Sequence, residues 1–338
     1  MAWSPDGRLL ASSGWDNAIR LWDLATGTCV QVLRDADHPD NLFRSVAWSP
    51  DGRLLASGRT LYGLQVWDVT TRTPRWVSRV HPTMIRRVAW SPDGTRLASG
   101  GDEGSLYVWD ASDGTLLARL QRHRGIVASV VWSPDGPSSS PYLPAPQAGL
   151  PVPRQGGGSL LASGGGSQGQ GGSGEIFLWD AHSGERLQTF VDVPGTVLAL
   201  DWSPRDPLLV SGGSDGMLRW WDVHSGQYMR VCQGHQGVIR SLRISPDGRR
   251  LASCGEDGTI KVWDLESGEL LQTLRRDRPY ERLNITGVQG LTEAQKATLR
   301  ALGAIEEVTP PFWQGYSVPC QIHLLPQEKD LCLRYLHK

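Results

Sequence analysis

The chain has 338 residues, and its 34 basic and 35 acidic side chains give a formal net charge of -1. This balance supplies no electrostatic footprint for nucleic acid or an anionic membrane surface, and no apolar stretch approaches the roughly 18 residues that span a bilayer. The five cysteines include no CxxC pair, which argues against a disulfide framework or a metal site, so we expect a cytoplasmic protein with no cofactor and no metal.

Two short signatures recur along the chain in register. Trp-Asp dipeptides form the first, with steps of 45, 42, 70, 42 and 42 residues between the copies at Trp22-Asp23, Trp67-Asp68, Trp109-Asp110, Trp179-Asp180, Trp221-Asp222 and Trp263-Asp264. The second is Trp-Ser-Pro-Asp-Gly, which begins at Trp3, Trp48, Trp90 and Trp132 and persists in weaker form from Trp202 and Ile244. A period near 42 residues indicates a repeat architecture.

Each copy reads as four short strands. In the third copy, apolar or β-branched residues fall at roughly every second position over 86–90, 96–99, 106–109 and 116–120. Ser-Pro-Asp-Gly suits a tight turn, because proline presets the backbone dihedral and glycine accepts positive φ. The 40 glycines and the lack of long runs with a 3.6-residue period exclude a helical fold.

The first copy is cut short at its start. It begins at Trp3, which leaves its inner strand only two preceding residues where other copies have about five. The last copy already has its own outer strand over 270–274, so two interpretations stay open: six sheets close a ring on a frayed first sheet, or the chain is a piece of a longer array. We favour the second, because unpaired edge strands invite association.

Two segments depart from the repeat. The 70-residue step contains 28 surplus residues, and 22 of them lie at 137–158, a stretch rich in proline, serine and glycine that we expect to be a disordered surface loop. Residues 276–338 change character. There, Thr292 and Gln295 have the spacing of a capping box, and Gly303 is placed to end a helix predicted over about 293–302.

The two signatures resemble those of the WD-repeat family over about residues 1–275. The resemblance implies an all-β fold, a β-propeller of six four-stranded blades with the first one truncated. It places the blades at about 1–34, 42–80, 83–120, 124–191, 195–232 and 236–275. A short C-terminal extension, residues 276–338, would follow and contain the one helix.

The family also implies a hydrogen-bonded chain inside a blade, made by a histidine, a serine or threonine, an aspartate and the repeat tryptophan. The sixth blade has all four, namely His235, Ser253, Asp257 and Trp263. The third has Glu103 in the aspartate place, and the second and fourth lack the acid, with Leu61 and Ser173 at that offset. Such a set could be read as a hydrolase triad, but it recurs at strand positions and ends on an indole that can only donate, so a structural role is favoured.

A propeller without a catalytic set is most economically a rigid binding platform. The resemblance implies docking on the top face, which carries the turns between second and third strands and the connections between blades. Arginine and tryptophan most often carry interface energy. The candidate protein-binding residues, chosen by their offset from the inner-strand signature or the top-turn acid, are Arg44, Arg86, Arg240, Trp15, Asp102 and Glu256. Solvated rim charges are the alternative interpretation.

Residues 277–282 and 290–295 resemble the extension that closes the WD-repeat region of bacterial STAND-type signalling NTPases. This implies an N-terminal NTPase domain missing from the chain and a role as the sensor module of a signalling protein, which binds a protein or peptide but neither nucleic acid nor membrane. One alternative is a propeller enzyme with a site in the channel, although the inner-strand positions are mainly Val46, Val88, Val130, Leu200 and Leu242. Another is a truncated fragment without independent activity.

Overall fold

The computed structural model describes residues 1–14, 16–35, 42–61, 63–121, 123–134, 160–167, 172–190, 193–275 and 283–306. Within this part of the chain, the strands form six sheets of four strands each, numbered here blades 1 to 6 in chain order, and one helix follows them. The chain divides into two compact units, Met1–Arg275 with the six blades and Arg276–Lys338 with the helix. The expected all-β propeller of six blades is confirmed.

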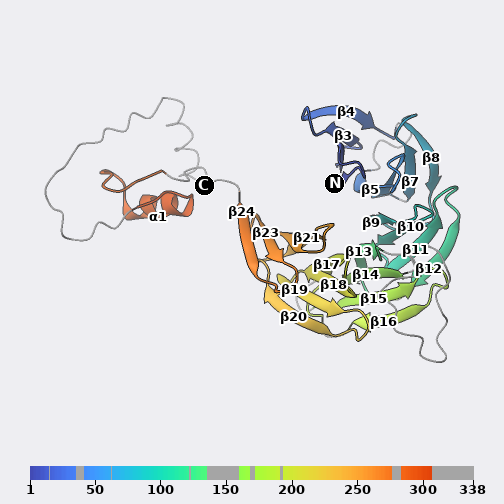
Figure 1. The fold of residues 1–338 in the computed structure, drawn as a ribbon. Helices are drawn as coiled ribbons and strands as arrows, with labels where there is room; N and C mark the ends of the chain where they lie inside the picture. The colour runs from blue at the N-terminus through green and yellow to red at the C-terminus, as the bar shows by residue number, and fades with distance from the viewer. Residues whose placement is uncertain are drawn as a thin grey trace. The chain divides into compact units, whose positions relative to one another are not determined.

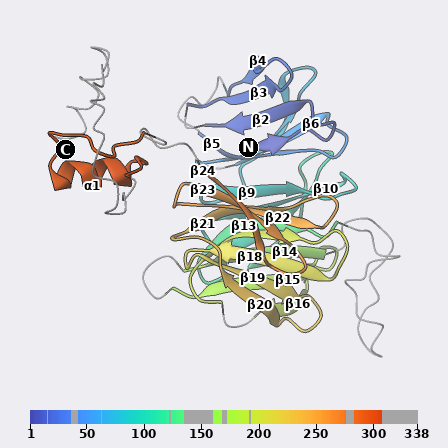
Figure 2. The ribbon, with the colours of Figure 1, turned by 60° about the vertical axis from the view of Figure 1, so that its left-hand side comes forward.

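Each blade is an antiparallel meander whose strands follow one another in chain order. The first three blades are β1–β4 (Ala2–Trp3, Leu9–Ser13, Ile19–Asp23, Thr28–Leu33), β5–β8 (Phe43–Trp48, Leu54–Arg59, Leu64–Asp68, Thr73–Ser78) and β9–β12 (Ile85–Trp90, Arg96–Gly101, Ser105–Asp110, Leu116–Gln121). The last three are β13–β16 (Ile126–Trp132, Leu160–Gly166, Gly174–Asp180, Arg186–Phe190), β17–β20 (Val197–Trp202, Leu208–Gly213, Met217–Asp222, Tyr228–Gln233) and β21–β24 (Ile239–Ile244, Arg250–Gly255, Thr259–Asp264, Leu270–Arg275). Figure 1 shows the first strands toward the centre and the fourth strands at the outer rim, and Figure 2 shows the same blades from another side.

The Ser-Pro-Asp-Gly segments form turns between first and second strands. In blade 2, Ser49 Oγ donates to Asp51 Oδ1 at 2.6 Å and accepts the Leu54 N–H at 2.9 Å, while Gly52 has a φ of +73°. Positive φ favours glycine, because glycine has no Cβ. The serine–aspartate bond recurs in blades 1, 3 and 6. The signature therefore encodes its turn through contacts within a few residues.

The Trp-Asp signature closes the next turn on the same side of the propeller. Asp110 Oδ1 accepts the Ser112 N–H at 2.8 Å, and Asp264 Oδ1 accepts the Ser267 N–H at 2.8 Å. These aspartates hold the turns between third and fourth strands, in the manner of Asx turns. Both signatures therefore specify turns through local hydrogen bonds, one before the second strand of a blade and the other after its third strand.

The hydrophobic core of the described residues consists of five clusters, each between two successive blades. Indoles bridge these blades as well as filling space between them. Trp132 Nε1 at the end of β13 donates to the Ala89 carbonyl of β9 at 3.0 Å. Trp220 is 2% exposed, as its place in the repeat suggests for an inter-sheet filler, and its Nε1 donates to the Leu265 carbonyl of blade 6 at 3.0 Å.

The second unit contains the expected helix, α1, over Glu293–Ala301. Its capping box is present, because Thr292 Oγ1 accepts the Gln295 N–H at 3.2 Å and Gln295 Oε1 accepts the Thr292 N–H at 2.9 Å. In the described parts of the chain, no helix is long and apolar enough to cross a membrane. The loop expected at 137–158 lies outside the described residues.

Candidate functional site

A chain of polar contacts runs through the interior of blade 6. His235 Nε2 lies 2.8 Å from Ser253 Oγ, and His235 Nδ1 lies 3.0 Å from Asp257 Oδ1. Trp263 Nε1 donates to the same Ser253 Oγ at 3.0 Å. The connectivity Ser–His–Asp matches that of a hydrolase triad, but Ser253 is only 2% exposed and its oxygen already accepts the indole N–H. The serine therefore has no access to a substrate, and the arrangement serves packing.

Asp257 is the ionised member at the end of this row of polar contacts. Burial alone would raise the pKa of Asp257, but hydrogen bonds from Thr259, His235 and Gln236 outweigh it and hold that pKa well below 3.8. A carboxylate with a lowered folded-state pKa stabilises the fold above its unfolded pKa, and this contribution is lost as the pH falls toward the folded-state pKa.

We therefore expect Asp257→Asn to lower the free energy of unfolding by about 1.5–3 kcal/mol at neutral pH, because it removes a charge-assisted hydrogen-bond acceptor. The difference from the parent protein should shrink as the pH is lowered from about 5 to about 3. Denaturant unfolding across this range measures it. Glu269→Gln removes the same charge from an exposed position of blade 6 and should change little. An equal effect of Asp257→Asn at both pH values would contradict the assignment.

Blade 3 has all the members of the same hydrogen-bonded network, with glutamate as its acid. His81 Nε2 lies 2.7 Å from Ser99 Oγ, and His81 Nδ1 lies 3.0 Å from Glu103 Oε1. Trp109 Nε1 donates to Ser99 Oγ at 2.7 Å. Burial opposes ionisation of Glu103, but bonds from His81 and Thr83 lower its pKa below the ordinary value. The longer side chain therefore does not interrupt the chain of contacts.

Blade 4 corrects the sequence-based expectation that it lacks an acid. His123 Nε2 lies 2.7 Å from Ser163 Oγ, and His123 Nδ1 lies 3.3 Å from Glu175 Oε2. Glu175 stands two residues beyond Ser173, because surplus residues in the preceding turn shift the acid onto β15. The sequence reasoning missed both groups. A signal for His123 was available, since it precedes Trp132 by nine residues, as His81 precedes its inner-strand tryptophan.

In the other blades, an arginine replaces the histidine as the partner of the acid. In blade 5, Arg219 Nη2 lies 2.6 Å from Asp215 Oδ2, and in blade 1 Arg20 pairs with Asp16. Each pair spans one turn between second and third strands. The serine–tryptophan bond is retained in both blades.

Blade 2 carries a buried ion pair that the sequence reasoning did not find. Arg59 is 2% exposed and Asp35 is 7% exposed, and Arg59 Nη2 contacts both Asp35 Oδ2 and Gln65 Oε1. The guanidinium also lies 5.6 Å from the centroid of the Phe43 ring. Burial lowers the pKa of Arg59, and Asp35 opposes this effect. Leu61, at the acid offset, is about half exposed.

The predicted binding residues that the structure describes lie at equivalent places of blades 2, 3 and 6. Arg86 is paired with Asp102 through two contacts, one of them from Nη2 to Oδ2 at 3.3 Å. Arg240 is paired in the same way with Glu256, with Nε 3.0 Å from Oε1. Four of the six candidates therefore form two internal ion pairs. Trp15, the only aromatic candidate, lies outside the described residues.

Arg44 differs from its two counterparts. It is exposed, and within the described residues it has no hydrogen bond or ion pair, because Thr60 stands where Asp102 and Glu256 stand in the other blades. Thr60 Oγ1 instead accepts the Leu42 N–H at 3.1 Å. Partial desolvation lowers the pKa of Arg44, the positive charges of Arg86 and Arg240 lower it further, and the carboxylate of Asp102 opposes them. The top face thus presents an arginine without a direct carboxylate contact among the described residues, within electrostatic reach of two other arginines and one acid.

The central axis holds a second group of charges. Arg87 on β9, Asp201 on β17, Arg243 on β21 and the Met1 ammonium act on one another electrostatically. Arg243 Nη1 lies 3.2 Å from Asp201 Oδ1. Burial, with a smaller contribution from Arg243, lowers the pKa of Arg87 to about 10, so Arg87 stays protonated at neutral pH. Strands of four blades can share such a group only at the propeller axis.

The axial charges show that the sequence-based prediction chose the wrong inner-strand residues as the lining of the channel. The residues expected to represent the channel pack instead between blades and are 1–7% exposed, namely Val46, Val88, Val130, Leu200 and Leu242. Side chains alternate between the two faces of a strand, so the charged residues one position before or after them point the other way. Asp201 is the one carboxylate in this axial group; burial raises its pKa, and its ion pair with Arg243 opposes that shift.

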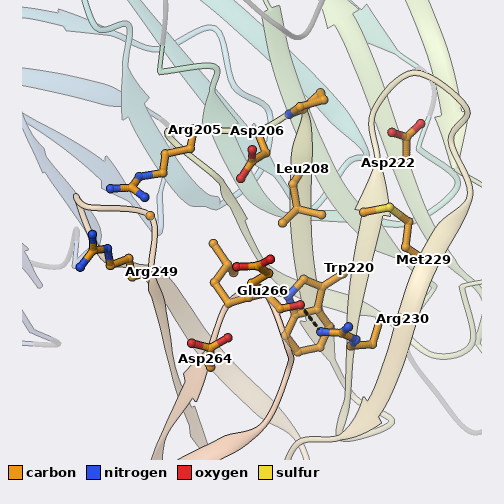
Figure 3. A pocket seen from close by; sticks show the side chains of 13 residues that line it. Arg205, Asp206, Leu208, Trp220, Asp222, Met229, Arg230, Arg249, Asp264 and Glu266 are labelled. Atoms are coloured by element: carbon orange, nitrogen blue, oxygen red, sulfur yellow. Dashed lines mark hydrogen bonds between the residues drawn. The ribbon is translucent and has the colours of Figure 1, made fainter.

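A groove of about 900 Å³ lies between blades 5 and 6, beside their Ser-Pro and Trp-Asp turns (Figure 3). Asp222 and Asp264 line it, but both cap turns through backbone N–H groups, and Arg230 donates to the Glu266 carbonyl at 2.5 Å. A second groove of about 570 Å³ occupies the equivalent place between blades 2 and 3. The groove therefore belongs to the repeat. No cluster of three or more potential metal ligands occurs among the described residues.

Comparison with protein families matches the repeat directly. The model of the WD domain, G-beta repeat, matches residues 1–23, 27–68, 72–110, 184–222 and 226–264, together more than half of the chain. Each matched stretch ends on the aspartate of a Trp-Asp pair. No curated protein matches the chain.

Proposed function

Because this chain belongs to the WD-repeat family, we propose that it is a non-catalytic scaffold that binds a protein or peptide on its top face. Propellers of this family typically act as protein-interaction platforms. The buried position of Ser253 and the pairing of Asp201 with Arg243 also favour binding over catalysis. Apolar clusters and indoles join the blades in succession from blade 1 to blade 6, which stiffens the platform.

The observation that carries the proposal is that Arg44, unlike Arg86 and Arg240, makes no direct carboxylate contact among the described residues. Exposed arginines with internal carboxylate partners offer little to a ligand, because a ligand must first replace the existing ion pair. Arg44 has no such partner among the described residues, and the nearby arginines make the region more attractive to an anion. We propose that the bound segment presents an aspartate, a glutamate or a terminal carboxylate to Arg44, with which a guanidinium forms strong bidentate bonds.

The cellular setting of this scaffold is a further part of the proposal. The resemblance of residues 277–282 and 290–295 to the extension of bacterial STAND-type NTPases supports a role as the sensor module of a cytoplasmic signalling protein. In that setting, ligand binding to the propeller would bias an attached NTPase domain. The coding sequence upstream of Met1 tests this part independently, because the proposal requires an in-frame NTPase domain there.

The binding proposal is tested with an array of acidic peptides and their amidated counterparts. We expect selective retention of acidic peptides, and Arg44→Glu should weaken it at least about tenfold, because a charge-assisted hydrogen bond contributes about 1.5–3 kcal/mol. Raising the salt concentration should weaken binding further. Arg249→Glu makes the same charge change in the exposed turn after β21 and should leave retention unchanged. Equal retention by Arg44→Glu and Arg249→Glu would remove Arg44 from the site.

A further inference from the structure

The inner strands of blades 2 to 6 each contain a β-bulge near their start, and the bulge leaves one residue without a partner in the register. In blade 5, Val197 pairs with Gly213 and Ala199 pairs with Gly212, so the register skips Leu198. Bulges are over-represented next to active sites, where they redirect a side chain. The skipped residues of blades 2 to 6, called here the bulge ring, are Arg44, Arg86, Ala128, Leu198 and Arg240.

The bulge ring presents side chains from several blades to one region. Figure 1 shows the inner strands that carry it toward the centre of the series of blades. The charges of Arg86 and Arg240 act on Arg44, so residues of blades 2, 3 and 6 lie within electrostatic reach of one another. The neighbours of Arg44 along the strand, Phe43 and Ser45, are 1% and 6% exposed, whereas Arg44 itself is exposed. The bulge therefore directs Arg44 away from the core.

The composition of the bulge ring differs between its two parts. Blades 2, 3 and 6 contribute arginines, whereas the adjacent blades 4 and 5 contribute Ala128 and Leu198. Leu198 is partly exposed, although Val197 and Ala199 on either side of it are 2% and 5% exposed. Leu198 belongs to none of the five core clusters of the described residues. Its aliphatic surface is thus available at a place where three other blades present a cation.

The surroundings of Leu198 are held by neutral contacts. Ser214 stands where blades 3 and 6 have their acids, and Ser214 Oγ accepts the Thr196 N–H at 2.8 Å. Thr60 makes the equivalent contact in blade 2. Thr196 Oγ1 also donates to the Ser167 carbonyl of blade 4 at 2.7 Å. These bonds fix the start of β17 without using Leu198.

We propose that the bound segment carries two anchors, a carboxylate for Arg44 and a large aliphatic side chain that packs on Leu198 beside Ala128. The inference rests on the proposed function and adds the second anchor to it. Transfer of an aliphatic side chain from water onto apolar surface is favourable in proportion to the area covered. A second acidic group placed against Leu198 would instead lose hydration without gaining a partner. The ligand class is therefore a peptide segment with an acidic and an aliphatic residue, and a purely acidic stretch binds less well.

The test uses the full chain and fluorescently labelled peptides that contain one aspartate. Leucine is placed at each position on either side of the aspartate, and every peptide has a counterpart with serine in place of the leucine. Fluorescence anisotropy gives the Kd of each peptide. We expect at least one spacing at which leucine lowers the Kd on the order of tenfold. Raising the salt concentration should weaken both peptides of that pair and leave their ratio nearly unchanged, because salt screens only the carboxylate contact.

Variants assign this advantage of leucine over serine to the bulge ring. Leu198→Asn should abolish the advantage while the serine peptide binds as before, which also shows that the variant is folded. Ala128→Asn leaves Leu198 in place and should reduce the same advantage. Leu117→Asn makes the leucine-to-asparagine change on the outer strand β12, where Leu117 is 47% exposed, and should keep the advantage. Arg44→Glu should weaken both peptides.

Three results would overturn the proposal. Equal affinity for the leucine and serine peptides at every spacing, with binding still dependent on the aspartate, would remove the aliphatic anchor and leave the proposed function intact. An advantage of leucine that survives both Leu198→Asn and Ala128→Asn would place the aliphatic contact elsewhere. Binding that does not depend on the aspartate would contradict the proposed function itself, and this inference with it.

Discussion

Replacement of Asp35 by alanine is expected to lower the free energy of unfolding by about 3–5 kcal/mol, because it leaves a buried arginine without its counter-ion. Arg59 is 2% exposed, so water cannot solvate the guanidinium that Asp35 now neutralises. Gln65 would remain as a neutral acceptor and cannot replace a charge. Urea denaturation followed by tryptophan fluorescence measures the change.

Two comparisons separate this effect from a general loss of charge. Asp16→Ala breaks an ion pair with Arg20 in which both side chains are substantially exposed, and its effect should be much smaller. The double variant Asp35→Leu with Arg59→Met should be more stable than Asp35→Leu alone, because it no longer buries an unpaired charge. Equal losses for Asp35→Ala and Asp16→Ala would show that the pair is hydrated in solution.

Trp132→Ala is expected to cost about 3–5 kcal/mol, whereas Trp3→Ala at the same repeat position should cost far less. Trp132 is 7% exposed, packs between blades 3 and 4 and bonds to the Ala89 carbonyl, so its removal leaves a cavity and an unpaired acceptor. Trp3 is 64% exposed and fills no comparable space. Thermal and urea unfolding of the two variants measure the contrast. Equal losses for Trp3→Ala and Trp132→Ala would contradict this contrast, because Trp3 would then be buried in solution.

Much of the propeller was predictable from short-range patterns. The turns depend on contacts that span a few residues, such as Ser49 with Asp51 and Asp110 with Ser112, so the signatures read in the chain correspond directly to hydrogen bonds. The same holds for the capping box of α1, in which Thr292 and Gln295 are three residues apart. A motif whose donor and acceptor lie close in sequence predicts the same hydrogen bond in any fold that contains it.

The candidate site was less accessible from the sequence. Counting a fixed offset assigned Ser173 to the acid position of blade 4, but surplus residues moved that role to Glu175, which reaches His123 from the next strand. The offset rule found Arg44, Arg86 and Arg240 as equivalent positions. It could not show that two of them are paired with acids while Arg44 is not.

The amino-acid pattern alone was sufficient for the number of blades, their strand order and the helix, since each follows from turns and periodicities contained within about 42 residues. The three-dimensional structure was needed to show the buried Arg59–Asp35 pair, the charges that meet at the axis and the exposure of Trp3 and Ile260. These features depend on which side chains meet across separate loops and blades. Burial and electrostatic pairing are properties of such long-range neighbours, and a repeat pattern specifies its own unit without specifying what covers the units at its ends.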